Sequence, residues 1–422
     1  MKKDDLSNKL KETPEEIDKI LYKAVFENKE LFIPLQESLK QLGYKGYSIY
    51  PLYREFSKKF LGFSVPAINI RGMTYDVART IFRVAKKLKV GALIFEIAKS
   101  EMGYTKQSPL EYATVVLSAG FREKFEGPIF IQGDHFQFNR KSYFADADRE
   151  KSNIKNLIKE AISAQFYNID IDASTLVVLE KESLEEQQKH NYEVTAEMAE
   201  FVRSIEPEGI TVNLGGEIGE IGGHNSTPEE LRVFMKGFNR VFKREVGISK
   251  ISVQTGTSHG GVVLPDGKVA TINLDFNTLK TLSKIAREEF GLAGAVQHGA
   301  STLPEDYFNL FPECECVEVH LATGFQNFIY DHPALPQEFR EKIYSYLKTN
   351  LKNEWKEDMT EAQFIYKTRK KGFGIFKKDW WDLSSEIKEK ILSDMEGLFE
   401  KIFRALNVVN TSDLVKSKVL SS

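Results

Sequence analysis

Residues 65–97 read VPAINIRGMTYDVARTIFRVAKKLKVGALIFEI and hold the pattern that decides the fold. A short run of apolar and β-branched residues comes first, an amphipathic helical stretch follows, and a second apolar run ends the unit. Such runs indicate buried strands, and helical spacing between two of them indicates a helix that joins parallel neighbours. Runs of this kind predict strands over residues 65–70, 92–97, 129–131, 169–171, 210–214, 248–253, 293–296 and 316–321.

Helix candidates alternate with these strands near residues 75–88, 109–123, 150–164, 190–204, 227–242, 276–290, 303–309 and 335–351. This alternation predicts an α/β fold of the (β/α)8 type, the TIM barrel. A doubly wound open sheet is the competing fold, but its Gly-x-Gly-x-x-Gly signature does not follow the first strand. We expect an N-terminal helical extension over residues 1–60, a catalytic barrel over 61–330, and the last barrel helix with a C-terminal helical arm over 331–422.

The composition excludes several classes of function. Lys and Arg number 58 against 61 Asp and Glu, so the net charge of −3 gives no basic field for nucleic acid or an anionic membrane. No apolar run approaches the ~20 residues that span a bilayer, and the N-terminus lacks the apolar core of a signal peptide. Cys314 and Cys316 cannot build a disulfide framework and are expected to be buried. We therefore expect a cytoplasmic protein that binds neither nucleic acid nor membrane.

The C-terminal region is basic and aromatic, with the run KKGFGIFKKDWW at residues 370–381. Such a run is compatible with nucleic-acid binding. The balanced charge around it favours an arm that packs its aromatic side chains on the barrel or on a second subunit and keeps its lysines in solvent. We expect a homodimer or a larger homo-oligomer.

Histidines gather at the predicted strand ends. The chain has 7 histidines; His135, His259, His298 and His320 lie at four strand ends, and His224 lies in the loop after strand five. Active sites of barrels form at the carboxyl ends of the strands. Three imidazoles from different strands suit a divalent transition metal and leave one coordination position for substrate. The candidate ligands are His135, His259 and His298.

Two further features accompany these histidines. Asp134 precedes His135 and, at the end of a strand, can lean over the same rim and move protons on a substrate oxygen. Residues 257–261 and 298–302 are loops of small residues after late strands, and such loops commonly hold phosphate in barrels.

These motifs resemble those of the class II, zinc-dependent fructose-bisphosphate aldolases. The resemblance covers residues 64–325 and rests on GDH at 133–135, IDAS at 171–174, GEIG at 216–219 with the glycines at 222–223, GTSHG at 256–260 and HGAS at 298–301. It implies that one catalytic zinc is bound by His135, His259 and His298. It also implies that Asp134 moves the proton of the hydroxyl on the carbon that leaves as the aldehyde.

The resemblance implies roles for other residues as well. Glu217 and Asp172 would hold a second or displaced metal ion. Gly260, Gly299 and Ser301 would line the phosphate site of the dihydroxyacetone phosphate half. The candidate substrate pocket also includes three residues at the ends of strands one and eight: Asn69, His320 and Thr323.

The sequence departs from the family pattern at three places. The acidic residues that the family places after the paired glycines are replaced by His224 and Asn225, so the candidates for the C–H base are His224 and Glu220. The family's Asn-x-Asp-Thr-Asp signature is replaced by HLATG at residues 320–324, and the lysine near the 257–260 loop is absent unless Lys268 replaces it. These departures leave another ketose phosphate or another aldehyde partner open.

The expected function is reversible aldol cleavage of a ketose 1,6-bisphosphate, by default fructose 1,6-bisphosphate, through a zinc-stabilised enediolate. The products are dihydroxyacetone phosphate and an aldehyde, which places the enzyme in carbohydrate metabolism such as glycolysis or gluconeogenesis. A metal-dependent sugar (phosphate) epimerase with retro-aldol chemistry is one alternative. A non-catalytic companion subunit of an aldolase is the other.

Overall fold

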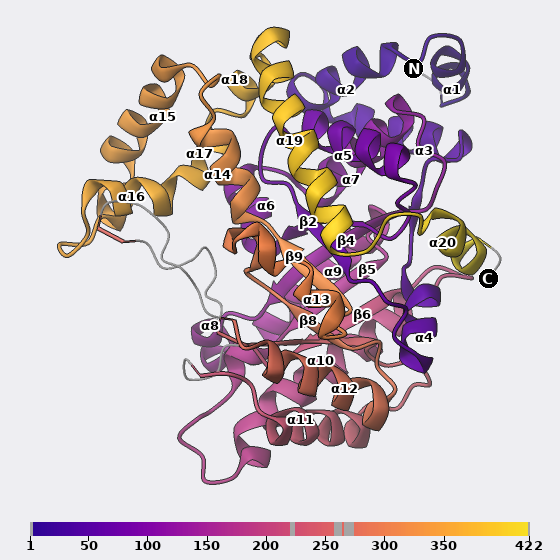
Figure 1. Ribbon diagram of the computed structural model, residues 1–422, viewed down its shortest axis with the longest axis vertical. Coiled ribbons are helices and arrows are strands. Elements are labelled where there is room, and N and C mark those ends of the chain that lie inside the picture. The colour runs from indigo at the N-terminus through magenta and orange to yellow at the C-terminus, as the bar shows by residue number, and fades with distance from the viewer. Residues whose placement is uncertain (1–2, 220–223, 257–263, 266–273, 421–422) are drawn as a thin grey trace.

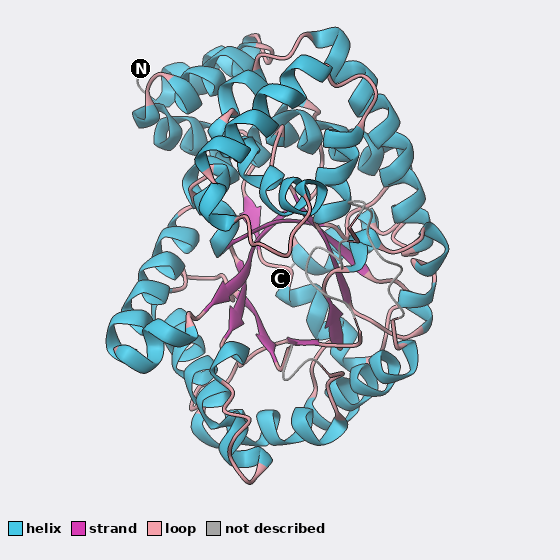
Figure 2. Ribbon diagram, turned by 90° about the vertical axis from the view of Figure 1, so that its left-hand side faces the viewer, coloured by secondary structure: helices cyan, strands magenta, loops and turns pink. Residues whose placement is uncertain are grey.

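The computed structural model describes residues 3–219, 224–256, 264–265 and 274–420. Its centre is a closed parallel sheet, seen down the barrel in Figure 2. The strands run in the order β4-β3-β2-β9-β8-β7-β6-β5, and a pairing between β4 and β5 closes the ring. The strands are β2 (Val65–Asn69), β3 (Ile94–Ala98), β4 (Ile129–Gln137), β5 (Asn168–Asp172), β6 (Asn213–Glu217), β7 (Lys250–Val253), β8 (Ala295–Gln297) and β9 (Glu318–Leu321). The prediction of a (β/α)8 barrel is confirmed.

Helices surround the ring, as expected from the amphipathic stretches between the strands. The larger ones that follow strands are α5 (Thr74–Leu88), α6 (Lys99–Thr105), α7 (Pro109–Arg122), α8 (Arg140–Ala145), α9 (Ala147–Ser163), α10 (Leu184–Ile205), α11 (Pro228–Val241), α12 (Phe276–Phe290) and α14 (Thr323–Asp331). Sequence signals fix several starts: the side chain of Thr227 accepts from the backbone N–H of Glu230, whose carboxylate returns to Thr227, and Pro228 begins α11.

One expected helix is replaced. Residues 303–309 contain only the 3₁₀ turn Glu305–Tyr307, and a single turn of α-helix, α13 (Leu310–Glu313), follows it. Pro304 lies within this segment and Pro312 shortly after it, and proline lacks the backbone N–H that a continuous helix needs. The helix prediction over 303–309 was therefore wrong.

The N-terminal segment wraps the barrel with four helices and one short strand (Figure 1). They are α1 (Lys3–Glu12), α2 (Glu16–Phe26), α3 (Phe32–Gln41), β1 (Gly46–Tyr47) and α4 (Tyr50–Lys58). β1 pairs with the beginning of β4, at the amino end of the strands, whereas α2 packs beside the C-terminal arm, where Phe26 contacts Trp381. From α4, Tyr53 extends into the barrel interior and is fully buried there.

The C-terminal segment forms the arm at the upper left of Figure 1 and then returns along the barrel. Its helices are α15 (Gln337–Asn350), α16 (Glu361–Thr368), α17 (Gly372–Ile375), α18 (Lys377–Trp381), α19 (Ser385–Ala405) and α20 (Ser412–Val419). Phe373 packs on Gly72 of the barrel, and Trp380 is buried, so the aromatic side chains lie against the same chain. The lysines differ from expectation, because Lys377 pairs with buried Glu111.

Two smaller expectations concern cysteine and membrane insertion. Cys314 and Cys316 are free and buried, as predicted. Within the described ranges, every helix is too short or too polar to cross a bilayer.

Candidate active site

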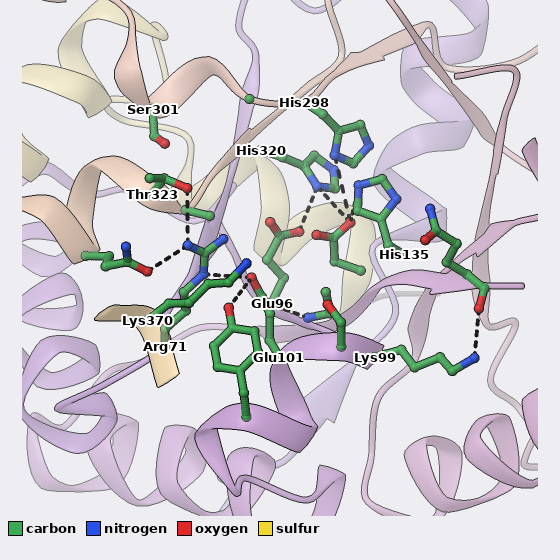
Figure 3. A pocket seen from close by; sticks show the side chains of 18 of the residues that line it. Arg71, Glu96, Lys99, Glu101, His135, His298, Ser301, His320, Thr323 and Lys370 are labelled. Atoms are coloured by element: carbon green, nitrogen blue, oxygen red, sulfur yellow. Dashed lines mark hydrogen bonds and ion pairs between the residues drawn. The ribbon is translucent and has the colours of Figure 1, made fainter. Parts of the chain in front are cut away.

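Three imidazoles meet at the carboxyl rim of the barrel (Figure 3). His135 comes from the end of β4, His298 follows β8, and His320 lies in β9. The ring centroids of His135 and His298 are 4.2 Å apart, and those of His298 and His320 are 4.0 Å apart. Strands far apart in the sequence therefore bring these side chains into direct contact.

A bulge in β4 explains how Asp134 and His135 face the same cavity. Neighbours on a regular strand point to opposite faces. Here the register between β4 and β5 shifts between Gly133 and Phe136, and His135 has a φ of 41°, in the left-handed region. A bulge of this kind redirects side chains, and both Asp134 and His135 line the cavity.

His135 is oriented by two carboxylates. Its Nδ1 lies 3.0 Å from Oδ2 of Asp172 and 3.1 Å from Oε2 of Glu217. Burial opposes a charge on this ring, but Asp134 and Glu217 outweigh it and raise the pKa of His135 well above its usual range. A carboxylate on one imidazole nitrogen is the usual way in which a protein fixes a ring for metal binding through the other nitrogen.

Asp172 is held by several neighbours. Its Oδ1 accepts hydrogen bonds from the backbone N–H and the hydroxyl of Ser174, and its Oδ2 accepts one from Nε2 of Gln137. The side chain is fully buried. With both oxygens engaged in this way, Asp172 orients His135 in this structure.

Asp134 lies between the imidazoles. Its Oδ1 is 3.3 Å from Nδ1 of His320, 3.8 Å from Nε2 of His135 and 3.9 Å from Nδ1 of His298. Burial opposes ionisation, but the charges of His135 and His320 outweigh it and lower the pKa of Asp134 well below its usual range. Asp134 is therefore a buried carboxyl group whose ionised form is favoured by the neighbouring imidazoles.

His320 lies among three carboxyl groups, those of Glu96, Asp134 and Glu318. Its Nε2 lies 2.6 Å from Oε1 of Glu318, and its Nδ1 lies 3.0 Å from Oε2 of Glu96. Burial disfavours the charge, but Glu96 and Asp134 raise the pKa of His320 well above its usual range. Ligand atoms of His320 also lie within 4.8 Å of those of Asp134 and His298.

Below His320, the barrel interior contains an ion network. Lys250 of β7 pairs with Asp170 at 2.9 Å and with Glu318 at 2.5 Å, and all three side chains are buried. Burial raises the pKa of Asp170 to about 6 and that of Glu96 to about 8. At the amino end of β9, the hydroxyl of Tyr53 donates a hydrogen bond to Oε2 of Glu318. Hydrogen bonds and ion pairs thus connect the N-terminal segment to Asp134.

The donor set beside Asp134 suits a metal ion. Ligand atoms of His135, Glu217 and His298 lie within 4.8 Å of one another. Burial and the charge of Asp172 raise the pKa of Glu217 to about 7. Two imidazoles and a carboxylate are the ligand types that zinc prefers.

A cavity of about 830 Å³ opens over this cluster. The predicted residues that line it are Asp134, His135, Glu217, His298, Gly299, Ser301, His320 and Thr323. Asn69 is buried below the cavity and donates to Glu101. His224 is exposed outside the cavity, with its Nδ1 2.8 Å from the carbonyl oxygen of Asn225. His259, Gly260 and Glu220 lie outside the described residues.

The sequence analysis missed four cations that line the cavity: Arg71, Lys99, Lys367 and Lys370. Arg71 follows β2 directly, so its place after the first strand was a usable signal. Lys370 belongs to the basic run that was expected to face solvent. Its place depends on how the C-terminal arm folds back, which no local pattern encodes.

A parallel barrel with imidazoles and carboxylates at its carboxyl rim defines a class of metal-dependent barrel enzymes. The family model for class II fructose-bisphosphate aldolases matches residues 58–408. The chain belongs to this family, and the resemblance found in the sequence is confirmed.

Solved structures agree at the level of the fold. Fructose-bisphosphate aldolase from Campylobacter jejuni is 19% identical, with a TM-score of 0.50 over 87% of this chain and 97% of that one. The YdjI aldolase from Escherichia coli K12 is 13% identical, with a TM-score of 0.50 over 87% and 99%. The fructuronate-tagaturonate epimerase UxaE from Cohnella laeviribosi is 14% identical, with a TM-score of 0.54 over 84% and 82%. A search of curated proteins finds no significant match.

Proposed function

We propose that this protein is a metal-dependent aldolase that reversibly cleaves a ketose 1,6-bisphosphate, with fructose 1,6-bisphosphate as the default substrate. The observation that carries the proposal is the buried carboxyl group of Asp134, whose Oδ1 lies 3.8 Å from Nε2 of His135 and 3.9 Å from Nδ1 of His298. Membership of the family supports a phosphorylated sugar as substrate. The products would be dihydroxyacetone phosphate and an aldehyde.

The proposed metal ligands are His135, His298 and Glu217, whose donor atoms lie close enough to share one ion. His259 remains a predicted ligand from the loop outside the described residues. Zinc at this position would supply Lewis acidity toward the ketone and hydroxyl oxygens of the substrate. Asp172 would hold the ring of His135, through the contact described above.

Asp134 would act as the proton-transfer residue. In the cleavage direction, it would accept the proton of the hydroxyl on the carbon that becomes the aldehyde. The carbon–carbon bond to that carbon would break, and its electron pair would stay with the dihydroxyacetone phosphate half. In condensation, the same carboxyl group would return the proton to the new alkoxide.

Other residues would bind the phosphate and remove the C–H proton. Gly299 and Ser301 line the cavity and support a phosphate site for the dihydroxyacetone phosphate half. His224 lies outside the cavity, so we retain Glu220 as the proposed C–H base. A homodimer or larger homo-oligomer in the cytoplasm remains our expectation.

The test is the Asp134→Asn variant, which keeps the shape of the side chain and removes its basicity. We expect it to bind metal stoichiometrically and to lose about 10²- to 10⁴-fold in the kcat for cleavage of fructose 1,6-bisphosphate, the range that a proton-transfer residue contributes. Measurements of bound zinc and of released triose phosphate check both outcomes. Retained cleavage would remove Asp134 from the mechanism.

The same assay separates the competing activities. Wild-type protein that converts a ketose bisphosphate into its epimer without free triose phosphate is an epimerase. Wild-type protein that can take up no metal is a companion subunit. Sedoheptulose and tagatose bisphosphates, offered in parallel, identify the sugar.

A further inference from the structure

His320 presents one imidazole nitrogen to a position where two carboxyl groups converge. Its Nδ1 lies 3.0 Å from Oε2 of Glu96, which is beside it in Figure 3, and 3.3 Å from Oδ1 of Asp134. Nδ1 of His320, Oδ1 of Asp134 and Oε1 of Glu96 are buried atoms without a hydrogen-bond partner among the described residues. The three residues are only 3%, 6% and 0% exposed. Because buried polar atoms are nearly always bonded, three such atoms in one cluster indicate that a ligand belongs there.

The separations between these atoms suit a metal ion. Zinc binds imidazole nitrogen and carboxylate oxygen at about 2.0–2.2 Å, so two ligands at octahedral or tetrahedral angles lie about 3.0–3.5 Å apart. The distances of 3.0 and 3.3 Å from Nδ1 of His320 fall in this range. A bridging water molecule with hydrogen bonds of about 2.8 Å would hold its two partners roughly 4.5 Å apart. Both observed distances are therefore too short for a water bridge.

The ring of His320 is held in the orientation that a metal ligand needs. Its Nε2 lies 2.6 Å from Oε1 of Glu318, and the same oxygen accepts hydrogen bonds from Lys250 and Gln132. A carboxylate that takes the N–H of one imidazole nitrogen leaves the lone pair of the other nitrogen for a metal. Glu318 therefore directs the free nitrogen of His320 toward the two carboxyl groups.

Glu96 is held in place from the neighbouring strand. It lies in β3, and its Oε2 accepts a hydrogen bond from Nε2 of Gln132 in β4 at 3.1 Å. Ligand atoms of Glu96 and His320 lie within 4.8 Å of one another, as do those of Asp134 and His320. All three side chains line the cavity, so an ion can reach them from the rim of the barrel.

The charges around this ring leave room for two more positive charges. Lys250 pairs with Asp170 and with Glu318. Neither Glu96 nor Asp134 forms an ion pair with a lysine or arginine in the part of the chain that the structure describes. Buried carboxylates without such a partner are unfavourable, and a divalent ion between these two would offset both charges.

We propose that Glu96, Asp134 and His320 form a second metal site, which binds a divalent transition-metal ion and shares no ligand with the proposed catalytic site. One imidazole and two carboxylates suit Zn²⁺ and similar ions such as Co²⁺. The site goes beyond the proposed aldolase activity and does not depend on it. Since a carboxylate has two oxygens, Asp134 can bind this ion through Oδ1 and keep its other oxygen for proton exchange.

The experiment counts metal ions on the full chain. Protein is stripped with a chelator, loaded with excess Zn²⁺, desalted and analysed for zinc by atomic emission. We expect two ions per wild-type chain and one ion per chain in Glu96→Gln and in His320→Gln, because each substitution removes a ligand of the second ion. Asp134→Asn is unsuitable here, since its amide oxygen can still bind a metal.

Glu111→Gln is the matched control. Glu111 is also a buried glutamate, but it pairs with Lys377 and does not line the cavity. This variant should keep two ions per chain. Two ions in both wild-type protein and Glu96→Gln, or one ion in wild-type protein, would overturn the proposal.

Anomalous diffraction from crystals of zinc-loaded wild-type protein tests the site without any substitution, so the result does not depend on how the variants fold. A zinc peak bounded by Glu96, Asp134 and His320 supports the proposal. A second ion at Glu217 and Asp172 instead, with no peak at His320, rejects it. Inactive protein that carries two ions would reject the aldolase function and leave the second metal site intact.

Discussion

At the scale of single residues, the geometry of the rim depends on His135. Its left-handed backbone conformation is uncommon for a residue other than glycine, and such strain is usually found at functional positions. The same bulge places Asp134 among three imidazoles and so keeps it ionised. One irregular residue therefore sets both the position of a metal ligand and the charge of the proton acceptor.

Metal affinity should rise with pH at this site. Glu217 has a pKa raised to about 7, and that of His135 is raised as well, while metal binding requires both groups without their protons. We expect affinity for zinc to increase by about tenfold per pH unit for each proton displaced as the pH rises from 6 to 8. Competition with a chelator at several pH values measures this dependence.

Glu217→Gln provides the comparison, because its amide does not titrate. The affinity of this variant for zinc should depend less steeply on pH than that of wild-type protein. The difference should correspond to at most one proton released on metal binding. An identical slope in both proteins would show that Glu217 does not lose a proton when the metal binds.

The sequence could identify the histidines of the rim but not the protonation state of each imidazole. His135 lies near the end of β4 and His298 directly follows β8, and these positions in a barrel are enough to place them together. The charge of His320 depends on Glu96 of a different strand and on Glu318, which lies two residues before it and shares its inward face. That two-residue spacing was the available signal for a buried ion pair.

At the scale of elements, the C-terminal arm joins the barrel through glycine contacts. Lys370 could not be predicted as a cavity residue, because Gly72 and Phe373 meet only after the arm has folded back. The aromatic composition of residues 370–381 correctly predicted that the aromatic side chains of this run are buried. Burial is favourable for large aromatic side chains because it removes their apolar surface from water.

Gly374→Ala should displace the arm. The new Cβ atom would meet backbone atoms of Tyr104 and Thr105, which cannot rotate away, so we expect a loss of about 1–3 kcal/mol in the free energy of unfolding. Limited proteolysis should cut more readily near α17, and the fluorescence of Trp380 should change. These readouts report on the arm directly.

Gly397→Ala is the control for this substitution. Gly397 lies in α19, and a Cβ atom there meets nothing within 4 Å. Alanine should stabilise the helix by up to about 1 kcal/mol. Equal destabilisation by both substitutions would contradict the close fit of the arm at Tyr104.

At the scale of the whole molecule, the ion network connects the two ends of the barrel. Tyr53 of α4 donates to Glu318, Glu318 contacts His320, and His320 contacts Asp134. The N-terminal segment therefore contributes a hydrogen bond to the barrel interior. Removal of one donor from this network leaves a buried charge less well compensated.

Tyr53→Phe should lower the free energy of unfolding by about 1–3 kcal/mol, the cost of depriving a buried charged group of one hydrogen bond. Urea denaturation measures this change. Tyr50→Phe is the control on the same helix, because its hydroxyl has no hydrogen-bond partner among the described residues and is expected to change stability by less than about 0.5 kcal/mol. Similar losses of unfolding free energy in both variants would show that the hydrogen bond from Tyr53 to Glu318 does not contribute to stability.

The closure of the ring has a consequence for biosynthesis. β2 pairs with β9, the backbone N–H of Ser64 donates to the carbonyl oxygen of Leu406, and α19 packs against α5. During translation, β2 therefore has one unsatisfied edge until β9 (Glu318–Leu321), about 250 residues further along the chain, has left the ribosome. An open edge of this kind is prone to mispairing with other strands until β9 is available.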